Sequence, residues 1–176
     1  MLDSTSNERF EREMLPHLDA AYNLARWLAG NESDARDVVQ ESFMRALGAF
    51  QNLRGTDTRA WLLAIVRNTA YSFLSKRSKH GHVSEEAMME IATAEPGPSA
   101  QVVGTERAGL IRHHLEMLPA PFREVIVLRE MEGLSYKQIA DVAGISIGTV
   151  MSRLARARKR LADTLAPSGQ EAADEL

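Results

Sequence analysis

The stretch LSYKQIADVAGISIGTVMSRLARARKRL (residues 134–161) predicts two short helices joined by a tight turn. The turn is Ala143-Gly144-Ile145-Ser146, in which the glycine can adopt a positive φ at low cost and the serine can cap the next helix. The small side chain of Ala140 lets the second helix cross close to the first, and Val150 is placed to fill that crossing. The stretch therefore predicts a helix-turn-helix, a motif typical of proteins that read DNA.

The helix expected from residue 147 onward has an apolar face and a polar face. At about 100° per residue, the apolar stripe holds Ile147, Val150, Leu154, Ala157, Leu161 and Leu165, and the opposite face holds Thr149, Ser152, Arg156 and Lys159. The start of such a helix meets base edges in the major groove, so we expect Ser152 and Arg156 to contact bases. Arg158 projects beside the apolar stripe and must snorkel or pair. A basic amphipathic helix alone is more often a solvated face, but the turn, cap and spacing together favour DNA binding.

Composition limits the class of protein. The 176 residues and the 44% hydrophobic content allow two small packed domains. No apolar run is long enough to cross a membrane and the acidic start does not resemble a signal peptide, so a soluble, cytoplasmic protein is expected. The absence of cysteine excludes disulfides, thiolate nucleophiles and cysteine-based zinc sites. The histidine pairs His80/His82 and His113/His114 lack further ligands, so no metal and no cofactor are expected.

Charge is unevenly distributed along the chain. The formal net charge is −3, yet residues 51–83 carry six cations and one acid, and residues 134–165 carry six cations and two acids. The second of these basic segments is the predicted helix-turn-helix. Two separated contacts with a polyanion such as DNA are therefore expected.

The first half of the chain has helical periodicity throughout. A single helix of about five turns should end near Gly30, with apolar residues Phe10, Met14, Leu18, Ala21, Leu24, Ala25 and Leu28 at three- and four-residue steps. A second helix over residues 34–50, capped by Asn31 or Ser33, should bury Val39, Phe43, Ala46, Leu47 and Phe50. A third over residues 59–77 should bury Leu62, Ile65, Val66, Thr69 and Phe73.

Two surfaces of this first half could bind a partner. The outer face of the second helix carries Asp37, Glu41, Met44 and Arg45, and it is either solvated or a docking surface. The third helix follows a polar loop at residues 51–58, holds Trp61, Asn68 and Tyr71, and ends in Lys76-Arg77-Ser78-Lys79. Aromatic side chains beside cations can hold unstacked single-stranded bases, although Trp61 taken alone is more often a core residue.

A segment without helical periodicity separates the two halves. Residues 78–107 contain Glu-Pro-Gly-Pro and an acidic excess, which predicts a flexible linker with one short helical turn near residues 85–91. Helices are then expected over residues 108–118 and 122–131, ending at Gly133 before the helix-turn-helix. The chain is thus predicted to be all-α. Two small helical domains occupy residues 1–79 and 108–166, with the linker at 80–107 and a disordered acidic tail at 167–176.

Four motifs follow one another along the chain. They are DARDVVQESF at residues 34–43, Trp61-Leu62 with Ile65 and Asn68, Leu118-Pro119 with Arg123-Glu124-Val125, and GTVMSRLARAR at residues 148–158. In this order and spacing, and over nearly its whole length, the chain resembles the extracytoplasmic-function (ECF) sigma factors of bacterial RNA polymerase. The resemblance implies a transcription initiation factor with a sigma-2-like bundle of three to four helices. It also implies a sigma-4-like domain of four helices, including the helix-turn-helix.

The resemblance also implies roles for individual residues. The first domain would bind the clamp coiled coil of the polymerase β′ subunit through Asp37, Gln40, Glu41 and Arg45. It would open and read the −10 promoter element through Arg54, Asp57, Arg59, Trp61, Asn68 and Lys76. The second domain would dock on the flap of the β subunit and read the −35 element through Tyr136, Lys137, Thr149, Ser152, Arg153, Arg156 and Lys159. The acidic linker would thread the RNA channel of the polymerase.

Regulation by an anti-sigma factor is a further implication. Two domains on a long linker should have little fixed contact in isolation, so that a partner can insert between them or wrap around them. The surfaces expected to be covered are residues 37–45 and the apolar seams around residues 122–131. The chain departs from the family pattern at Met151, Ser72 and Ser75, so the details of promoter recognition do not carry over.

Three other classes of protein fit the pattern less well. A sigma-factor mimic that titrates an anti-sigma factor would lose its DNA contacts, whereas this chain keeps Arg153, Arg156, Lys159 and Arg160. A two-component or quorum-type regulator shares the helix-turn-helix, but the first half lacks the alternating strands of a receiver domain. An enzyme is least expected, because the sequence has no phosphate loop, metal cluster or nucleophile constellation.

Overall fold

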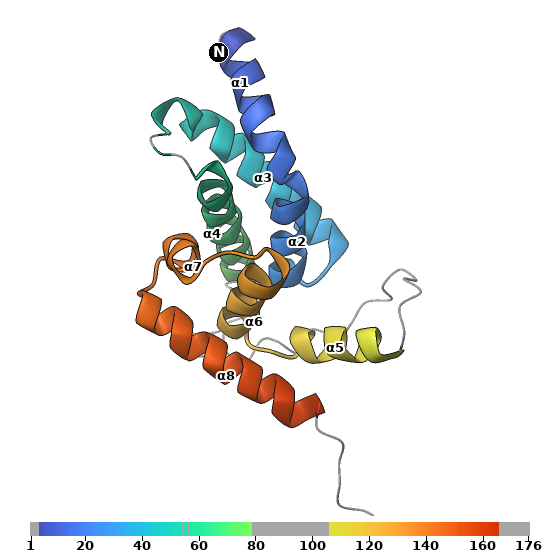
Figure 1. Cartoon of the computed structure of the whole chain (residues 1–176). Coiled ribbons are helices and arrows are strands. Elements are labelled where there is room, and N and C mark those ends of the chain that lie inside the picture. The colour runs from blue at the N-terminus through green and yellow to red at the C-terminus, as the bar shows by residue number, and fades with distance from the viewer. Residues whose placement is uncertain (1–3, 54, 56, 79–105, 166–176) are drawn as a thin grey trace, which may run out of the picture.

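The computed structural model describes residues 4–53, 55, 57–78 and 106–165, and every regular element in these ranges is a helix (Figure 1). The all-α prediction is therefore confirmed for these residues. Nearly all of the linker predicted at residues 80–107, with its helical turn near 85–91, lies outside the described residues, as does the tail at 167–176. None of the described helices is long and apolar enough to span a bilayer.

The first helical unit runs from residue 4 to residue 78. It contains α1 (Ser4–Met14), α2 (Leu18–Ala29), α3 (Glu32–Ala49) and α4 (Thr58–Ser78), with short 3₁₀ helices η1 (Leu15–His17) before α2 and η2 (Phe50–Asn52) after α3. The helices α2, α3 and α4 pack against one another around buried side chains such as Leu24 and Leu62. Phe10 of α1 extends this core with two edge-to-face contacts, since its ring centroid lies 5.2 Å from that of Phe50 and 6.3 Å from that of Phe43.

The single helix expected before Gly30 is broken in the structure. Pro16 lies in η1 between α1 and α2, and because proline has no N–H it cannot join the helical hydrogen-bond ladder. Leu18, just after this break, is 41% exposed, whereas the other six residues of the predicted stripe are buried. The predictions of a continuous helix and of a buried Leu18 were therefore wrong.

The boundary between α2 and α3 follows the sequence prediction. Gly30 has a φ of 87° and donates its N–H to the carbonyl of Arg26. Asn31 then caps α3, because its side chain accepts a hydrogen bond from the backbone N–H of Asp34 at 2.9 Å. Of the residues predicted to be buried in α3, η2 and α4, the structure buries Ala46, Phe50, Leu62, Val66 and Thr69, and it half-buries Val39, Phe43, Leu47, Ile65 and Phe73. The buried line of α3 is instead Ala35, Val38, Ser42 and Ala46, so the predicted stripe was rotated by about one residue.

The second helical unit runs from residue 106 to residue 165. It contains α5 (Glu106–Glu116), α6 (Ala120–Ile126), the π-helical turn η4 (Val127–Met131), α7 (Tyr136–Ala143) and α8 (Ile147–Leu165). The helix predicted over residues 122–131 is therefore α-helical only in its first part. In the π turn, the backbone N–H of Glu132 donates to the carbonyl of Val127 at 3.0 Å, five residues back.

The helices α7 and α8 form the predicted helix-turn-helix. Ser135 and Gln138 make a capping box at the start of α7. Gly144 has a φ of 66°, and its backbone N–H donates to the carbonyl of Ala140, four residues earlier. The hydroxyl of Ser146 accepts a hydrogen bond from the backbone N–H of Thr149 at 3.1 Å, at the start of α8. The turn, its glycine and its serine cap are thus confirmed.

The apolar stripe of α8 matches the prediction in its middle. Val150, Leu154 and Ala157 are buried, and Leu161 and Leu165 are half-buried. Ile147 was predicted in the stripe but is 46% exposed. It is the first residue of α8 and follows directly on the turn.

Gly144→Ala is expected to lower the free energy of unfolding by about 1 kcal/mol, because a side chain in the left-handed region costs about that much. The added Cβ would meet no atom within 4 Å, so the cost would come from the backbone alone. Urea unfolding measures this change. Gly148→Ala is the control: this glycine is helical and the new Cβ would make an ordinary 3.8 Å contact with Ser146. It should stabilise the chain by about 0.5 to 1 kcal/mol. Equal effects of the two changes would contradict the left-handed conformation assigned to Gly144.

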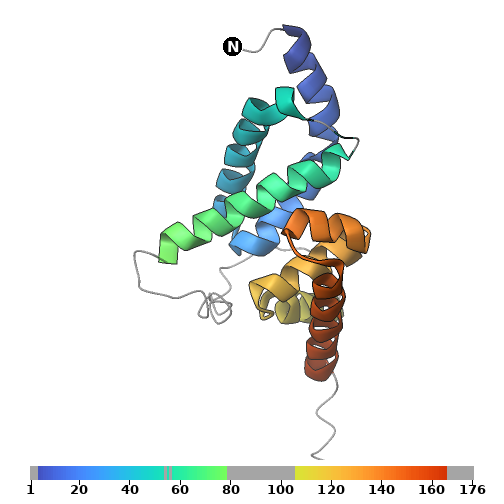
Figure 2. The ribbon, with the colours of Figure 1, turned by 90° about the vertical axis from the view of Figure 1, so that its left-hand side faces the viewer.

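The two units pack against each other, contrary to the expectation of little fixed contact. The helix α4 of the first unit lies beside α7 of the second, and α2 lies beside α6 (Figure 1, Figure 2). Buried apolar side chains of both units belong to one cluster. The expectation rested on the composition of the linker. Because the entropy of closing a loop grows only slowly with its length, a long connection does not prevent docking of complementary surfaces.

Candidate nucleic-acid interface

The outer face of α8 is open to solvent. It is formed by Thr149, Ser152, Arg156 and Lys159, and it is called the reading face below. Ser152, Arg156 and Lys159 are exposed and Thr149 is half-buried. The hydroxyl of Ser152 donates to the carbonyl of Thr149 at 3.0 Å, and Lys159 pairs with Asp163 at 3.0 Å in an exposed ion pair. Within the described part of the chain, Arg156 has no hydrogen-bond or ion-pair partner. Its guanidinium is therefore available to an external acceptor.

The other predicted −35 residues lie around this face. Lys137 is exposed at the start of α7. Tyr136 is half-buried, and the guanidinium carbon of Arg129 lies 5.1 Å from its ring centroid. Arg153 is half-buried at the edge of the reading face, near Tyr71 of α4. Burial and then Glu124 raise the pKa of Tyr71, and the cations Arg67 and Arg153 act in the opposite direction.

Arg158 was predicted to snorkel or to pair, and it pairs. Its Nη2 lies 2.7 Å from Oε1 of Glu130 in η4. The ion pair is exposed on both sides and holds α8 to the π turn of the same unit.

The predicted −10 residues begin at the loop before α4, where Arg54 lies outside the described residues. Asp57 caps α4, since its Oδ1 accepts from the backbone N–H of Ala60 at 2.9 Å. Its Oδ2 accepts from Nε2 of Gln138, in α7, at 2.7 Å. These two hydrogen bonds, the one from Ala60 first, lower the pKa of Asp57.

Three further −10 candidates are spread along α4. Trp61 is half-buried and packs against the apolar cluster, as a core residue does. Asn68 is exposed, and its Oδ1 accepts from Nη1 of Arg67 at 3.3 Å. Lys76 is exposed near the C-terminal end of the helix. The structure therefore places these side chains along one helix without bringing them together.

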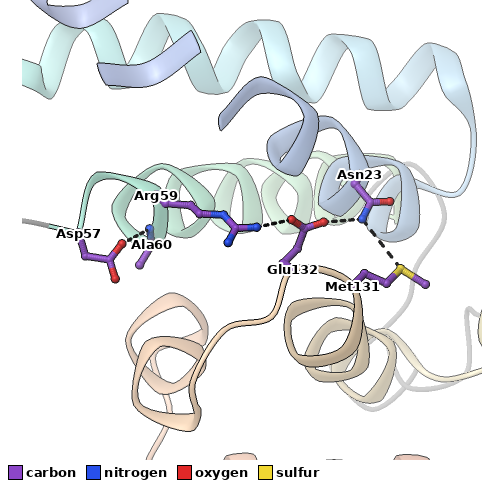
Figure 3. Close-up of polar contacts among 6 residues, drawn as sticks. All are labelled: Asn23, Asp57, Arg59, Ala60, Met131 and Glu132. Carbon is purple, nitrogen blue, oxygen red and sulfur yellow. Dashed lines mark hydrogen bonds and ion pairs between the residues drawn. The ribbon is translucent and has the colours of Figure 1, made fainter. Parts of the chain in front are cut away.

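Arg59, the remaining −10 candidate, is engaged by the second unit. Its Nη2 lies 2.6 Å from Oε2 of Glu132, and Oε1 of the same carboxylate accepts from Nδ2 of Asn23 at 2.5 Å (Figure 3). The Glu132 side chain is only 8% exposed. One carboxylate of the second unit thus binds side chains from both α2 and α4.

A second carboxylate, that of Glu124 in α6, is fully buried between the units. Its Oε1 lies 2.5 Å from Nε of Arg67, and its Oε2 accepts from the hydroxyl of Tyr71 at 2.9 Å. Both partners belong to α4. The buried charge is therefore compensated entirely by the first unit, as far as the described residues show.

The four residues predicted to bind the polymerase share the outer face of α3. Asp37, Gln40, Glu41 and Arg45 are all exposed. Glu41 pairs with Arg45 one turn later at 2.8 Å, and Met44 beside them is 64% exposed. An accessible acidic face with an apolar side chain is thus present where the sequence predicts it.

Comparison with known proteins identifies the family. The chain matches Sigma-70 region 2 over residues 14–80 and Sigma-70, region 4 over residues 108–161. It is 34% identical over 176 residues to the ECF RNA polymerase sigma factor SigE of Mycolicibacterium smegmatis, which covers 97% of this chain and 67% of that protein. It is 33% identical over 145 residues to the ECF RNA polymerase sigma factor EcfG of Rhodopseudomonas palustris, with 82% and 78% covered. The chain belongs to the ECF sigma factors.

Two solved structures share the fold over about nine-tenths of the chain. The sigma factor RpoE from Bartonella quintana, in complex with the anti-sigma factor NepR, matches with a TM-score of 0.74 and 30% identity, covering 92% of this chain and 99% of that one. CnrH, in complex with the cytosolic domain of CnrY, matches with a TM-score of 0.63 and 28% identity, covering 90% and 88%. The prediction of an all-α sigma factor with sigma-2-like and sigma-4-like parts is confirmed.

The residues that join the two units of this sigma factor were missed by reasoning from sequence. They include Asn23, Arg67, Tyr71, Arg123, Glu124, Glu132 and Gln138. One sequence feature could have pointed to them: Arg123 and Glu124 interrupt an otherwise apolar run from residue 122 to residue 128. Because a charged side chain on a buried helix face needs a partner, this interruption predicts a contact outside the helix.

Proposed function

We propose that this sigma factor binds core RNA polymerase and directs it to promoters, reading the −35 element with the second unit and opening and reading the −10 element with the first. The observation that carries the proposal is the exposed reading face of α8, where hydroxyls at the start of the helix are followed by Arg156 and Lys159. Promoter opening would be driven by binding energy, so no catalytic residue is required. The protein would act in the cytoplasm, together with the polymerase.

Transcription in vitro tests this function. Core polymerase and the purified chain would be given a library with random sequence upstream of the start site, and the transcribed templates would be sequenced. A bipartite motif at −35 and −10 is expected to be enriched over core polymerase alone. If the chain enriches no sequence, the proposed function is wrong.

Arg156→Ala is expected to weaken binding to the selected −35 duplex and to alter its base preference, because a base-edge contact carries about 1 to 3 kcal/mol of discrimination. Fluorescence anisotropy with single-base variants of the duplex measures both effects. If affinity falls equally for every sequence, Arg156 contacts only a phosphate.

Lys159→Ala is expected to lower affinity without changing the preferred sequence. Removing one phosphate contact should reduce the slope of log affinity against log salt by about 0.9. The exposed ion pair of Lys159 with Asp163 contributes only a few tenths of a kcal/mol, so it should not prevent the lysine from binding DNA. An unchanged salt slope would remove Lys159 from the interface.

An anti-sigma factor is the proposed regulator, since the similar sigma factor RpoE of Bartonella quintana is seen in complex with the anti-sigma factor NepR. Of the two predicted docking surfaces, residues 37–45 remain mostly exposed. In the other, around residues 122–131, residues 122–128 are buried and only its end is accessible, with Met131 42% exposed. Exposed apolar side chains of that unit include Leu110, Ile111 and Met117 on α5.

Co-purification from unstressed native cells tests for the anti-sigma factor. Recovery of the chain only free or on polymerase would contradict this regulation.

A further inference from the structure

Two large apolar side chains are exposed at the start of α8, beside the reading face. Ile147 is 46% exposed, and Met151, one turn later, is 54% exposed. Over about the first two and a half turns of the helix, the side chains on this flank are all apolar or absent. This strip is called the apolar border below, and its members, all exposed, are Ile147, Gly148, Met151 and Ala155.

The apolar border is continuous with the reading face. At about 100° per residue, Gly148 precedes Ser152 by about 40° around the helix axis, so the two surfaces meet without a gap. In both views α8 lies at the edge of the molecule, with α6 and α7 packed on its inner side (Figure 1, Figure 2). A partner that covers the reading face would therefore also cover the apolar border.

The position of the apolar border matches that of base-reading side chains. In a helix-turn-helix, the N-terminal residues of the second helix contact base edges in the major groove. Ile147 is the first residue of α8. Helical side chains lean toward the N-terminus of their helix, so Met151 covers the turn that begins with Ile147. The pair is thus placed where α8 would enter the groove.

The hydroxyl groups near this pair are already engaged within the chain. The hydroxyls of Ser146 and Thr149 lie 2.9 Å apart, and Ser152 donates to the carbonyl of Thr149 at 3.0 Å. A base that meets the apolar border itself would find only apolar atoms. In the major groove of DNA, the apolar group among the base edges is the C5-methyl of thymine.

We propose that Met151 and Ile147 read thymine in the −35 element through its C5-methyl group. The contact would add a preference for A·T pairs beside the bases met by Ser152 and Arg156. The proposal rests on the −35 role proposed for α8. The β-branched side chain of Ile147 offers a stiff surface, whereas the flexible thioether of Met151 can adapt to the methyl group.

The charges around the apolar border favour DNA over a protein partner. Arg156 and Lys159 lie on the adjoining reading face, and Lys137 is exposed at the start of α7. Such cations attract a polyanion, whose phosphates would satisfy them. An apolar protein segment on the same strip would cover cations without offering them acceptors, which is costly.

Replacement of thymine by uracil tests the contact without changing the protein, since uracil lacks only the C5-methyl group. The −35 duplex selected by the promoter library would be made with each thymine replaced in turn. Fluorescence anisotropy would measure its affinity for the full chain. At one or two positions, uracil should weaken binding by about fourfold, the effect expected when one methyl group is no longer removed from water. The other thymines should tolerate the replacement.

Variants of the two side chains assign the effect. Met151→Ala should abolish the thymine–uracil difference at one position, and Ile147→Ala should abolish it there or at the next base pair. Leu15→Ala is the control, because Leu15 is 52% exposed but lies in η1 of the first unit. It should keep the full difference.

Met151→Arg tests whether position 151 faces a base. Arginine binds the O6 and N7 atoms of guanine in the major groove, so the preferred pair at this position should change from A·T to G·C. Single-base variants of the duplex measure the change. An unchanged preference would show that position 151 does not face a base, and it would overturn the proposal.

Two further results would also overturn it. If uracil has no effect at any thymine of a selected −35 element, the apolar border does not read thymine and is free for a protein partner. If the difference persists in both Met151→Ala and Ile147→Ala, another group reads the methyl. A library that enriches no −35 sequence would instead remove the proposed function, and this proposal with it.

Discussion

Asp37→Lys combined with Glu41→Lys is expected to abolish promoter-directed transcription. Both carboxylates are exposed on α3, one turn apart, on the face proposed to bind the clamp coiled coil of the polymerase. Charge pairs across an interface are coupled by about 1.5 kcal/mol or more each, so reversing two of them should weaken binding to core polymerase at least about 100-fold. Core-polymerase affinity and transcription from a selected promoter measure the two effects.

The same double change should leave folding and −35 binding intact. Within α3 it replaces the Glu41–Arg45 pair by two cations, which costs a few tenths of a kcal/mol. Glu8→Lys with Glu11→Lys is the control, since these exposed acids of α1 give the same change of net charge. The control variant should transcribe normally. Wild-type affinity for core polymerase in the Asp37/Glu41 variant would refute the docking role of α3.

Local structure was predictable wherever one residue decides it. A glycine is needed at Gly144 and Gly30 because each adopts a positive φ, at 66° and 87°. Ser146 was recognised as a cap, and Asn31 as one of two candidates with Ser33, because such side chains can accept from a backbone N–H three residues later. These requirements are set within a few residues of sequence, so no tertiary information is needed to find them.

Errors arose where packing decides the outcome. The stripe of α3 was drawn through its large side chains Val39, Phe43 and Leu47, but small residues such as Ala35 and Ser42 face the core, where they let neighbouring helices approach. Ser42 can be buried because its hydroxyl donates to the carbonyl of Val38 at 2.6 Å. The width of the space between helices is set by the fold as a whole, so it cannot be predicted from the hydrophobic periodicity of the sequence.

The candidate site was predictable on α8 and on α3 but not at the boundary between the units. An exposed face needs only helical geometry, so the reading face and the outer face of α3 were found from spacing alone. The partners of Glu132 lie 73 and 109 residues away along the chain, and Asn23 and Arg59 carry no local mark of a long-range contact. In the sequence, only the charged residues Arg123 and Glu124, set in an apolar run, could have indicated that such a contact exists.

Arg123 is expected to contribute the largest single-residue stabilisation in the second unit. It is 7% exposed, and its guanidinium donates to four backbone carbonyls: Leu115 at 3.2 Å and Glu116, Leu118 and Trp27 at 2.7 Å each. Leu115 and Glu116 lie in the last turn of α5 and Leu118 lies two residues beyond its end, where carbonyls lack the helical N–H donors of the helix interior. The carbonyl of Leu115 also accepts from the backbone N–H of Leu118 at 3.1 Å. The fourth belongs to α2 and links the units. Burial acts to lower the pKa of Arg123, and the charge of Glu116 acts against this.

Arg123→Met is expected to lower the free energy of unfolding by about 3 to 5 kcal/mol, because it leaves buried carbonyls without a donor while keeping much of the apolar stem. Urea unfolding of the full chain, followed by circular dichroism, measures the loss. Arg112→Met, at an exposed site on α5, is the control and should change stability by no more than about 0.5 kcal/mol. Arg123→Lys keeps the charge but lacks the planar fork that reaches several carbonyls at once, so it should recover only part of the loss. Full recovery by lysine would mean that the charge, and not the fork of hydrogen bonds, holds the end of α5 in place.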